Sequence, residues 1–337
     1  MNGNGTVIWG AGGGQPFARA LHQSMRSLKG SEAVALNDIV DGLFPVGETK
    51  FQTEQSVWGK SVVIVQDVAN VYAPGSLNDK LMAAYLMTDA AKRSGAEAIH
   101  VVLPYLPYGR QDKPDRKHNE PASGALVAQM FDGLAGSSTP VYVHTVDLHS
   151  EQGETLFRNA HLINYQTAGV IGNFAAKELG TENLVLGATD TAGSKRNRPL
   201  AEVLRVRLVG AVKDRDPVTN EILAHYLQGN VNGKRVLIHD DMIDTGGTML
   251  ETVDLMRREG AAEIAVSTSH LLFTKDAEAI FAHYLRDGRI KRIIATNSVY
   301  KDDAFKARNP QITFLPVEML IGKNILNITE GNPVEYM

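Results

Sequence analysis

Short apolar runs alternate along the chain with longer stretches in which apolar residues recur every three or four positions. The apolar runs are typical of buried strands and fall at 6–9, 61–65, 98–103, 141–146, 184–187, 208–212, 236–239, 263–270, 293–296 and 312–315. Helical periodicity is found around 17–25, 81–86, 123–134, 249–256, 277–285 and 317–328. Because strands and helices alternate throughout, we expect parallel sheets with helices on both faces.

The length of the chain, 337 residues, indicates two domains at about 150 residues each. The series of strands and helices starts again near residue 160, which places the predicted domains at 1–158 and 159–337. The last strand or helix is a candidate for packing back on the N-terminal domain. Polar motifs follow the carboxyl ends of the predicted strands, where open α/β sheets bind their ligands.

The composition excludes several classes of protein and site. The net charge of −4 provides no basic field for nucleic acid, and the absence of cysteine excludes disulfides and thiolate chemistry. Residues 1–5 lack the charged and apolar regions of a signal peptide, and no apolar run approaches the ~20 residues of a membrane span. We therefore expect a cytoplasmic protein with no nucleic acid or membrane partner.

The stretch between the strand at 236–239 and the helix that carries Met249, Val253 and Met256 has the strongest chemical signal. It consists of Asp240, Asp241, Met242, Ile243, Asp244, Thr245, Gly246, Gly247 and Thr248. Helix-start N–H groups and the helix dipole attract phosphate, the glycines let the backbone approach a ligand, and the threonines add hydroxyl donors. The first two aspartates are placed to bind ribose hydroxyls or a magnesium ion on a diphosphate. A capped βα turn is the alternative, but the length of the pattern favours a phosphate site.

The glycine-rich segment Gly10–Gly14 nearly matches a dinucleotide-binding fingerprint. Gln15 stands where the last glycine of that fingerprint belongs, and no strand that ends in an acidic residue follows ~20 residues later. We therefore interpret the segment as a strand–loop–helix turn that can face a phosphate.

Two further motifs follow predicted strands of the N-terminal half. Arg110 and Gln111, with the lysine two residues on, could hold a polyphosphate and a base, although a solvated turn is the simpler alternative. Asp147 and His149 are two residues apart at a strand end, so an extended backbone would point both in one direction, toward a shared cation or phosphate. A histidine at the edge of the core with an aspartate partner is an equal alternative.

Two more pairs lie between strands. Phe44 and Glu48 could stack on and hydrogen-bond an adenine, or simply belong to a surface turn with one buried Phe. Lys213 and Arg215, in what we expect to be a polar loop, could stabilise charge during phosphoryl transfer, or belong to an ordinary charged surface loop.

The order of these motifs changes the interpretation. The succession is Phe44 to Glu48, Pro104 to Lys113, Asp147-Leu148-His149, Asp190 to Arg196, Lys213-Asp214-Arg215 and Asp240 to Thr248. It resembles the ribose-phosphate diphosphokinases (phosphoribosyl-diphosphate synthetases) over nearly the whole chain, down to Gly331–Tyr336. The resemblance implies an α/β fold of two type I phosphoribosyltransferase-like domains, each a mostly parallel sheet with helices on both faces.

The resemblance also implies the reaction and its residues. Magnesium-dependent transfer of the β,γ-diphosphate of ATP to the 1-hydroxyl of ribose 5-phosphate would release AMP. The implied ATP-binding residues are Phe44, Gly47, Glu48, Arg110, Gln111, Asp112 and Lys113, with the first three reaching the adenine of a neighbouring subunit. The implied magnesium ligands are His149, Asp190 and Asp147, and the implied catalytic residues are Lys213 and Arg215 on a mobile loop. The implied ribose phosphate site comprises Asp240, Asp241, Asp244, Thr245, Gly246, Gly247 and Thr248. The family also implies a homo-oligomer built from dimers, often a hexamer.

Several positions depart from the family pattern. They are Val46, Thr191-Ala192-Gly193, Asn119-Glu120-Pro121, His270-Leu271 and the longer segment after Arg215. Because several of these would face the acceptor, a larger ribosyl 5-phosphate such as ADP-ribose is an alternative acceptor. A phosphoribosyltransferase and a non-catalytic regulatory relative are further alternatives. The presence of Lys213, Arg215 and His149 favours activity.

Overall fold

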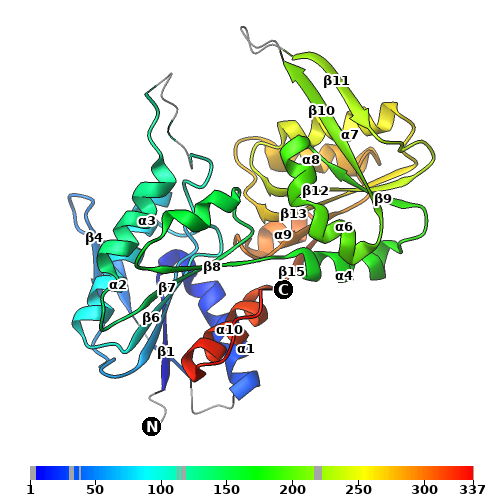
Figure 1. Ribbon diagram of the computed structural model, residues 1–337. Coiled ribbons are helices and arrows are strands. Elements are labelled where there is room, and N and C mark those ends of the chain that lie inside the picture. The colour runs from blue at the N-terminus through cyan, green and yellow to red at the C-terminus, as the bar shows by residue number, and fades with distance from the viewer. Residues whose placement is uncertain are drawn as a thin grey trace. The chain divides into compact units, whose positions relative to one another are not determined.

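The structure is a computed structural model that describes residues 5–29, 34–37, 39–111, 114, 119–215 and 222–336. The chain forms two compact units (Figure 1). The first unit comprises Met1–Gln166, Ser298–Lys301 and Val317–Met337, and the second comprises Thr167–Asn297 and Asp302–Pro316. The C-terminal segment therefore belongs to the first unit.

The sheet of the first unit has six strands among the described residues, all parallel, in the order β2-β1-β5-β6-β7-β8. They are β1 (Thr6–Gly10), β2 (Val34–Asn37), β5 (Ser61–Val65), β6 (Ala98–Val102), β7 (Val141–Val146) and β8 (His161–Tyr165). A separate antiparallel hairpin consists of β3 (Val40–Leu43) and β4 (Thr49–Gln52). Because β8 pairs with β7, this unit continues to Gln166.

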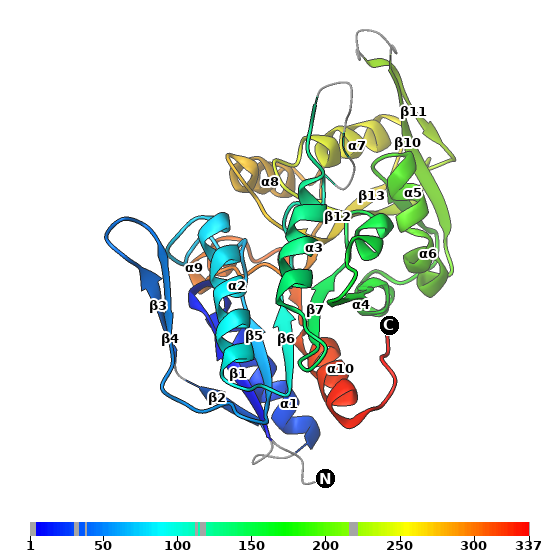
Figure 2. The ribbon, with the colours of Figure 1, turned by 60° about the vertical axis from the view of Figure 1, so that its left-hand side comes forward.

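Helices cover both faces of the first sheet. The helical elements are η1 (Gly12–Gly14), α1 (Gln15–Lys29), α2 (Leu77–Arg93), α3 (Ser123–Leu134), η2 (Glu151–Leu156) and α10 (Glu318–Glu330). α1 and α10 lie side by side on one face (Figure 1), and α2 packs beside α3 on the other (Figure 2). Val62 and Ile64 of β5 enter the core under α2, while Val63 and Val65 enter the core under α1, as strand alternation requires.

The second unit has a sheet of seven strands within its described part, in the order β11-β10-β9-β12-β13-β14-β15. They are β9 (Leu184–Ala188), β10 (Arg207–Arg215), β11 (Ile222–Gln228), β12 (Arg235–Ile243), β13 (Glu263–Leu271), β14 (Ile293–Thr296) and β15 (Ile312–Leu315). Neighbours are parallel except β10 and β11. The helices are α4 (Ala168–Leu179), α5 (Thr191–Arg196), α6 (Arg198–Leu204), α7 (Gly247–Arg258), α8 (Ala277–Arg286) and α9 (Asp303–Arg308).

The core of the second unit also has two sides. Met249, Val253 and Met256 of α7 are buried with Phe281 of α8 in one cluster. Helices α4 and α6 supply the opposite cluster, through residues such as Leu200. The expected apolar stripe on α7 and the expected architecture, two mostly parallel sheets with helices on both faces, are confirmed.

Each sheet reverses its strand order at one point. In the first sheet the chain passes from β1 to β2 on one side, and from β5 to β6, β7 and β8 on the other, so the reversal lies between β1 and β5. In the second sheet the equivalent reversal lies between β9 and β12. Open α/β sheets bind ligands at such a switch point, outside the carboxyl ends of the two strands.

Two local expectations are wrong. Lys213 and Arg215 do not lie in a loop, because β10 continues to Arg215 and pairs with β11 in an antiparallel hairpin with a register shift at Asp214 and Arg215. Asp147 and His149 are not joined by extended backbone, since β7 ends at Val146 and Asp147 has a φ of +35°. The alternation rule that would point both side chains in one direction therefore does not apply.

Candidate functional site

The turn between β12 and α7 is open toward solvent. Gly246, with a φ of +81°, is the N-terminal cap of α7, and no side chain in the described ranges caps this helix. The N–H groups of the first helical turn lack partners inside the helix, so they are available to an anion. Thr245, Gly247 and Thr248 are exposed, and a Cβ at Gly247 would have no described atom within 4 Å. The turn can therefore present both N–H and hydroxyl donors to a phosphate.

The inner side of the same turn is tightly packed. A Cβ at Gly246 would overlap the ring of Phe281, which is fully buried in the core beneath α7. The carboxylate of Asp244 accepts a hydrogen bond from the hydroxyl of Thr274, and the N–H of Thr274 donates to the carbonyl of Asp244 at 3.1 Å. These contacts fix the turn from beneath, so its donors are held in place before a ligand arrives.

A cluster of charges lies on β12 just before this turn. Nη2 of Arg196 is 3.3 Å from Oδ1 of Asp240 and 3.1 Å from Oδ1 of Asp241. The hydroxyl of Thr189 donates to Oδ2 of Asp240 at 2.8 Å. Burial and then the charge of Asp241 raise the pKa of Asp240 well above its usual range, and Arg196 opposes this shift. Two neighbouring carboxylates thus share one guanidinium, which leaves negative charge that a second cation could offset.

The loop after β9 meets this cluster at the switch point of the second sheet. Asp190 caps α5, because its carboxylate accepts the N–H of Gly193. Thr191 and Ala192 are exposed beside it. Asp190 follows β9 and Asp240 lies within β12, and these two strands are direct neighbours, since Ala188 pairs with His239. The structure therefore brings the expected Asp190 motif and the Asp240 to Thr248 motif to one edge of the second sheet.

Asp147 and His149 belong to the first unit and are half-buried at the carboxyl end of β7. The N–H of Asp147 donates to the carbonyl of Tyr165 at 2.9 Å, and the next N–H, of Leu148, donates to Oδ1 of Asn164 at 3.1 Å. These bonds hold the segment against β8. Among the described residues, no group of three or more His, Asp or Glu side chains is arranged to hold a metal ion by itself.

The remaining expected residues also lie in the first unit or in partly described segments. Phe44, Gly47 and Glu48 form the exposed tip of the β3–β4 hairpin, where the N–H of Phe44 donates to the carbonyl of Glu48 at 2.7 Å. Phe44 is therefore not the buried residue of a surface turn. Arg110 and Gln111 are exposed after β6, and the side-chain oxygen of Gln111 accepts from the hydroxyl of Ser123 at 2.7 Å.

Asp112 and Lys113 lie outside the described residues, as do the side chains of Lys213 and Arg215, whose backbone belongs to β10.

Sequence reasoning missed three residues that organise the candidate site on the second sheet. They are Thr189, Arg196 and Asn197. Asn197 is buried and donates to the carbonyl of His239 at 2.9 Å, which ties the start of α6 to β12. Arg196 is 44 positions from Asp240, so its ion pairs follow only from the pairing of β9 with β12. The one feature of the sequence that could have indicated these ion pairs is that the Asp190 motif ends in a basic residue, Arg196.

None of the helices in the described ranges combines the length and the hydrophobicity that a membrane crossing requires.

Comparisons with known proteins agree with this geometry. Residues 15–134 match the N-terminal domain of ribose phosphate pyrophosphokinase, and residues 164–293 match the phosphoribosyl transferase domain. A ribose-phosphate pyrophosphokinase of Aquifex aeolicus is 29% identical over 92% of this chain and 94% of its own length. The crystal structure of phosphoribosylpyrophosphate synthetase from Mycobacterium smegmatis superimposes with a TM-score of 0.84 at 25% identity, over 98% of this chain and 100% of that one.

A third relative, ribose-phosphate pyrophosphokinase 2 of Enterococcus faecalis, is 31% identical over 86% of this chain and 85% of its own length. Such identity over most of both chains, together with the two matched domains in the same order, shows that this chain belongs to the ribose-phosphate pyrophosphokinase family.

Proposed function

We propose that the protein transfers the β,γ-diphosphate of ATP to the 1-hydroxyl of ribose 5-phosphate, which gives phosphoribosyl diphosphate and AMP. The relatives named above are, by name, ribose-phosphate pyrophosphokinases or a phosphoribosylpyrophosphate synthetase. Each of them matches at least 86% of this chain. The match of residues 15–134 to the N-terminal domain of ribose phosphate pyrophosphokinase, together with the named relatives, favours this reaction over a phosphoribosyltransferase or a non-catalytic relative.

The observation that carries the proposal is the open start of α7 beside the Asp240–Asp241 pair. The 5-phosphate would accept N–H and hydroxyl bonds from Thr245 to Thr248, where the helix dipole adds attraction. The carboxylates of β12 would accept hydrogen bonds from the ribose hydroxyls. A phosphate and a diol a few ångströms apart are the features that distinguish a ribosyl phosphate from a simple anion.

Diphosphoryl transfer depends on positioning and on charge neutralisation more than on a nucleophilic side chain. On the ATP side, Arg110 and Gln111 would bind the nucleotide, with Asp112 and Lys113 completing that segment. Lys213 and Arg215, at the end of β10, would stabilise the charge that develops on the transferred group. The ribose 1-hydroxyl loses its proton as it attacks the β-phosphorus, and the bond to the α-phosphate oxygen breaks to release AMP.

The residues present fit a magnesium requirement. Magnesium prefers oxygen ligands and is usually held by one or two carboxylates together with substrate phosphates. Asp190 would supply a carboxylate in the second unit, and Asp147 with His149 would supply further ligands in the first unit. The carboxylate surplus at Asp240 and Asp241 supports a bound cation nearby. Bound magnesium would neutralise phosphate charge during transfer.

The hairpin tip supports an assembled protein. Phe44 is 45% exposed and Val46 is 81% exposed, which is costly for apolar side chains unless a ligand or another copy covers them. We propose that this tip reaches the adenine bound by a neighbouring copy, so that the active protein is a homo-oligomer built from dimers. A cytoplasmic location, where ATP is abundant, accords with this proposal.

The test is AMP formation from ATP and magnesium, with ribose 5-phosphate and ADP-ribose as separate acceptors and with product masses determined. We expect AMP with ribose 5-phosphate and a product heavier by one diphosphoryl group. No AMP, or a clear preference for ADP-ribose, would overturn the proposed reaction or its acceptor. Lys213→Ala should lower kcat strongly, whereas Lys177→Ala, on the exposed side of α4, should not. Intact turnover in Lys213→Ala would refute the catalytic role.

A further inference from the structure

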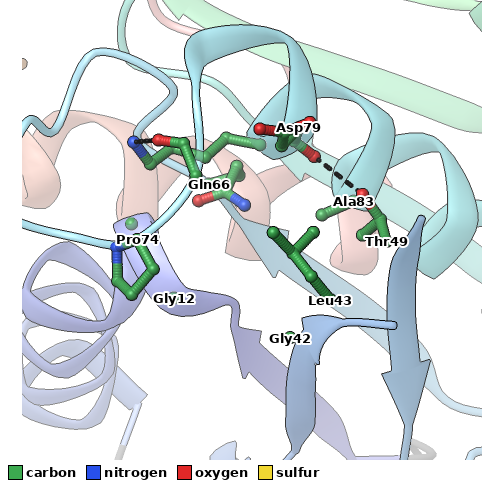
Figure 3. Close-up of a pocket in the computed structure, with 11 residues that line it drawn as sticks. Gly12, Gly42, Leu43, Thr49, Gln66, Pro74, Asp79 and Ala83 are labelled. Carbon is green, nitrogen blue, oxygen red and sulfur yellow. Dashed lines mark hydrogen bonds between the residues drawn. The ribbon is translucent and has the colours of Figure 1, made fainter. Parts of the chain in front are cut away.

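The first sheet has a pocket at its own switch point. It has a volume of about 130 Å³ and lies where the loop after β1, the residue after β5, the base of the β3–β4 hairpin and the start of α2 come together (Figure 3). Its lining includes Leu43, Gln66, Pro74, Asp79, Lys80 and Ala83. An engineered cavity of roughly 150 Å³ in another protein holds benzene, so this pocket has room for a single ring.

Gln66 supplies an unpaired polar group to this pocket. The residue is 1% exposed, and its Oε1 has no hydrogen-bond partner among the described residues. Figure 3 shows its amide between Pro74 and Leu43. A buried carbonyl oxygen without a donor is costly, and most such oxygens in native proteins have a partner. Gln66 is therefore poised to accept a hydrogen bond from a molecule that enters the pocket.

The wall beside Gln66 is closely packed. A Cβ at Gly13 would overlap the carbonyl of Asp67 and would lie 2.8 Å from Oε1 of Gln66. The carbonyl of Gly13 also accepts a hydrogen bond from Nδ2 of Asn70 at 2.8 Å, and Asn70 is itself buried. These contacts fix the loop after β1 against the end of β5, so the position of the Gln66 amide is set by the fold.

The charges in the pocket nearly cancel. Lys80 is 6% exposed, and its ammonium donates to the carbonyl of Gly75 at 2.8 Å. The carboxylate of Asp79 accepts from the N–H and the hydroxyl of Ser76, in the capping box of α2. Leu43, Pro74 and Ala83 supply apolar walls. An ammonium and a carboxylate in one small lining disfavour a strongly charged ligand of either sign.

We propose that this pocket binds a small uncharged ring compound, of the size of a pentose or a pyrimidine base, that donates an O–H or N–H hydrogen bond to Oε1 of Gln66. Its apolar edge packs against Leu43 and Pro74. None of the lining residues is among the proposed catalytic or substrate-binding residues, and the proposal is independent of the proposed function.

Such a ligand would also restrain the β3–β4 hairpin. Leu43 and Thr49 line the pocket at the two ends of the hairpin turn, and the hydroxyl of Thr49 makes a long hydrogen bond of 3.5 Å to the carbonyl of Asp79. A ring between the hairpin and α2 adds contacts to both. We therefore expect ligand binding to slow backbone hydrogen exchange in residues 40–52.

The experiment uses saturation-transfer NMR on the full chain with D-ribose and with uracil, each at roughly millimolar concentration. At least one of the two should show transfer, and a soaked crystal should show it beside Gln66. Transfer from neither compound, or density elsewhere, would overturn the proposal. Transfer from one compound alone identifies which ring the site accepts.

Two variants and a control separate binding from folding. Gln66→Met keeps the volume but removes the acceptor, so the thermal midpoint should stay equal or rise while binding weakens about tenfold or more. Ala83→Leu should fill the pocket and abolish binding. Met82→Leu, on the outer face of the same helix at 43% exposure, should bind as the wild type does. Equal binding by wild type and Gln66→Met would refute the role of Gln66. Binding without slower exchange in the hairpin would refute the restraint.

Discussion

Gly246 offers a sharp test of the turn that we assign to the sugar phosphate, because its neighbour Gly247 provides a matched control. Gly246→Ala would place a Cβ on a residue with a φ of +81°, which costs about 1–2 kcal/mol for a side chain that is not glycine. The new methyl would also overlap the buried ring of Phe281, and such overpacking costs about 1–3 kcal/mol. The second unit should therefore lose about 2–5 kcal/mol of stability.

Gly247→Ala should behave oppositely. No described atom lies within 4 Å of a Cβ at this position, and the residue is the first of α7, where alanine is a better helix former by up to about 1 kcal/mol. Its stability should be unchanged or slightly higher. The methyl would nevertheless project from the exposed side of the turn, so the KM for ribose 5-phosphate should rise. One glycine is thus required for folding and the other for ligand access.

The assay must report on the second unit alone. Both tryptophans, Trp9 and Trp58, belong to the first unit, so their fluorescence monitors the unit that is not mutated. Hydrogen exchange in α7 and α8 monitors the mutated one. The expected loss corresponds to a fall in Tm of roughly 4–20 °C for Gly246→Ala. If Gly246→Ala proved as stable as Gly247→Ala, the left-handed backbone or the Phe281 contact would be wrong.

Three further perturbations test other parts of the structure. Arg196→Gln leaves two neighbouring carboxylates of β12 without their cation and should cost about 1–3 kcal/mol in denaturant unfolding; unchanged stability would contradict the shared ion pair. Burial lowers the pKa of His100 to about 3, so the unfolded chain takes up the proton first and stability falls as the pH drops from about 6.5 toward 3. At pH 5 the loss is about 2 kcal/mol relative to pH 8, and it should be smaller in His100→Gln; an equal loss would exclude this histidine as the cause. Asp132→Asn weakens a carboxylate that accepts three backbone N–H groups at 158–160 and should cost about 1–3 kcal/mol, whereas the exposed Asp89→Asn should cost at most about 0.5 kcal/mol.

The apolar runs identified most of the central strands because those strands are buried on both faces. Ser61–Val65 and Leu184–Ala188 are buried throughout and read as strands without ambiguity. Edge strands were harder to predict from the sequence. β8 carries a histidine and an asparagine in five residues, and among the described strands β11 pairs with β10 alone, so neither needs a continuous apolar run. Pairing with neighbours, which the local pattern does not encode, decides their structure.

The residues of the candidate site also divide into those that the sequence indicated and those that it did not. Asp240 to Thr248 could be read from the sequence because a helix start and its preceding strand are adjacent in the chain. Arg196 and Thr189 could not, because they reach Asp240 only through the parallel pairing of β9 with β12. Asp147 was misjudged for a different reason: its backbone leaves the strand with a positive φ, which aspartate adopts more readily than most residues but does not require.

The two switch points share one topology but differ in charge, and salt should therefore separate them. At the second, an open helix start and a carboxylate pair with one guanidinium would hold a charged sugar phosphate. At the first, one lysine and one aspartate nearly cancel around an unpaired amide, Gln66, which favours an uncharged ring. Raising the ionic strength from about 0.1 M to 1 M shortens the Debye length from about 10 Å to 3 Å. Ribose 5-phosphate, measured by calorimetry, should then bind more weakly, whereas saturation transfer to D-ribose or uracil should be unaffected. If the uncharged ring lost affinity in parallel with the sugar phosphate, the two ligands would share one charged site, and the first pocket would have no separate role.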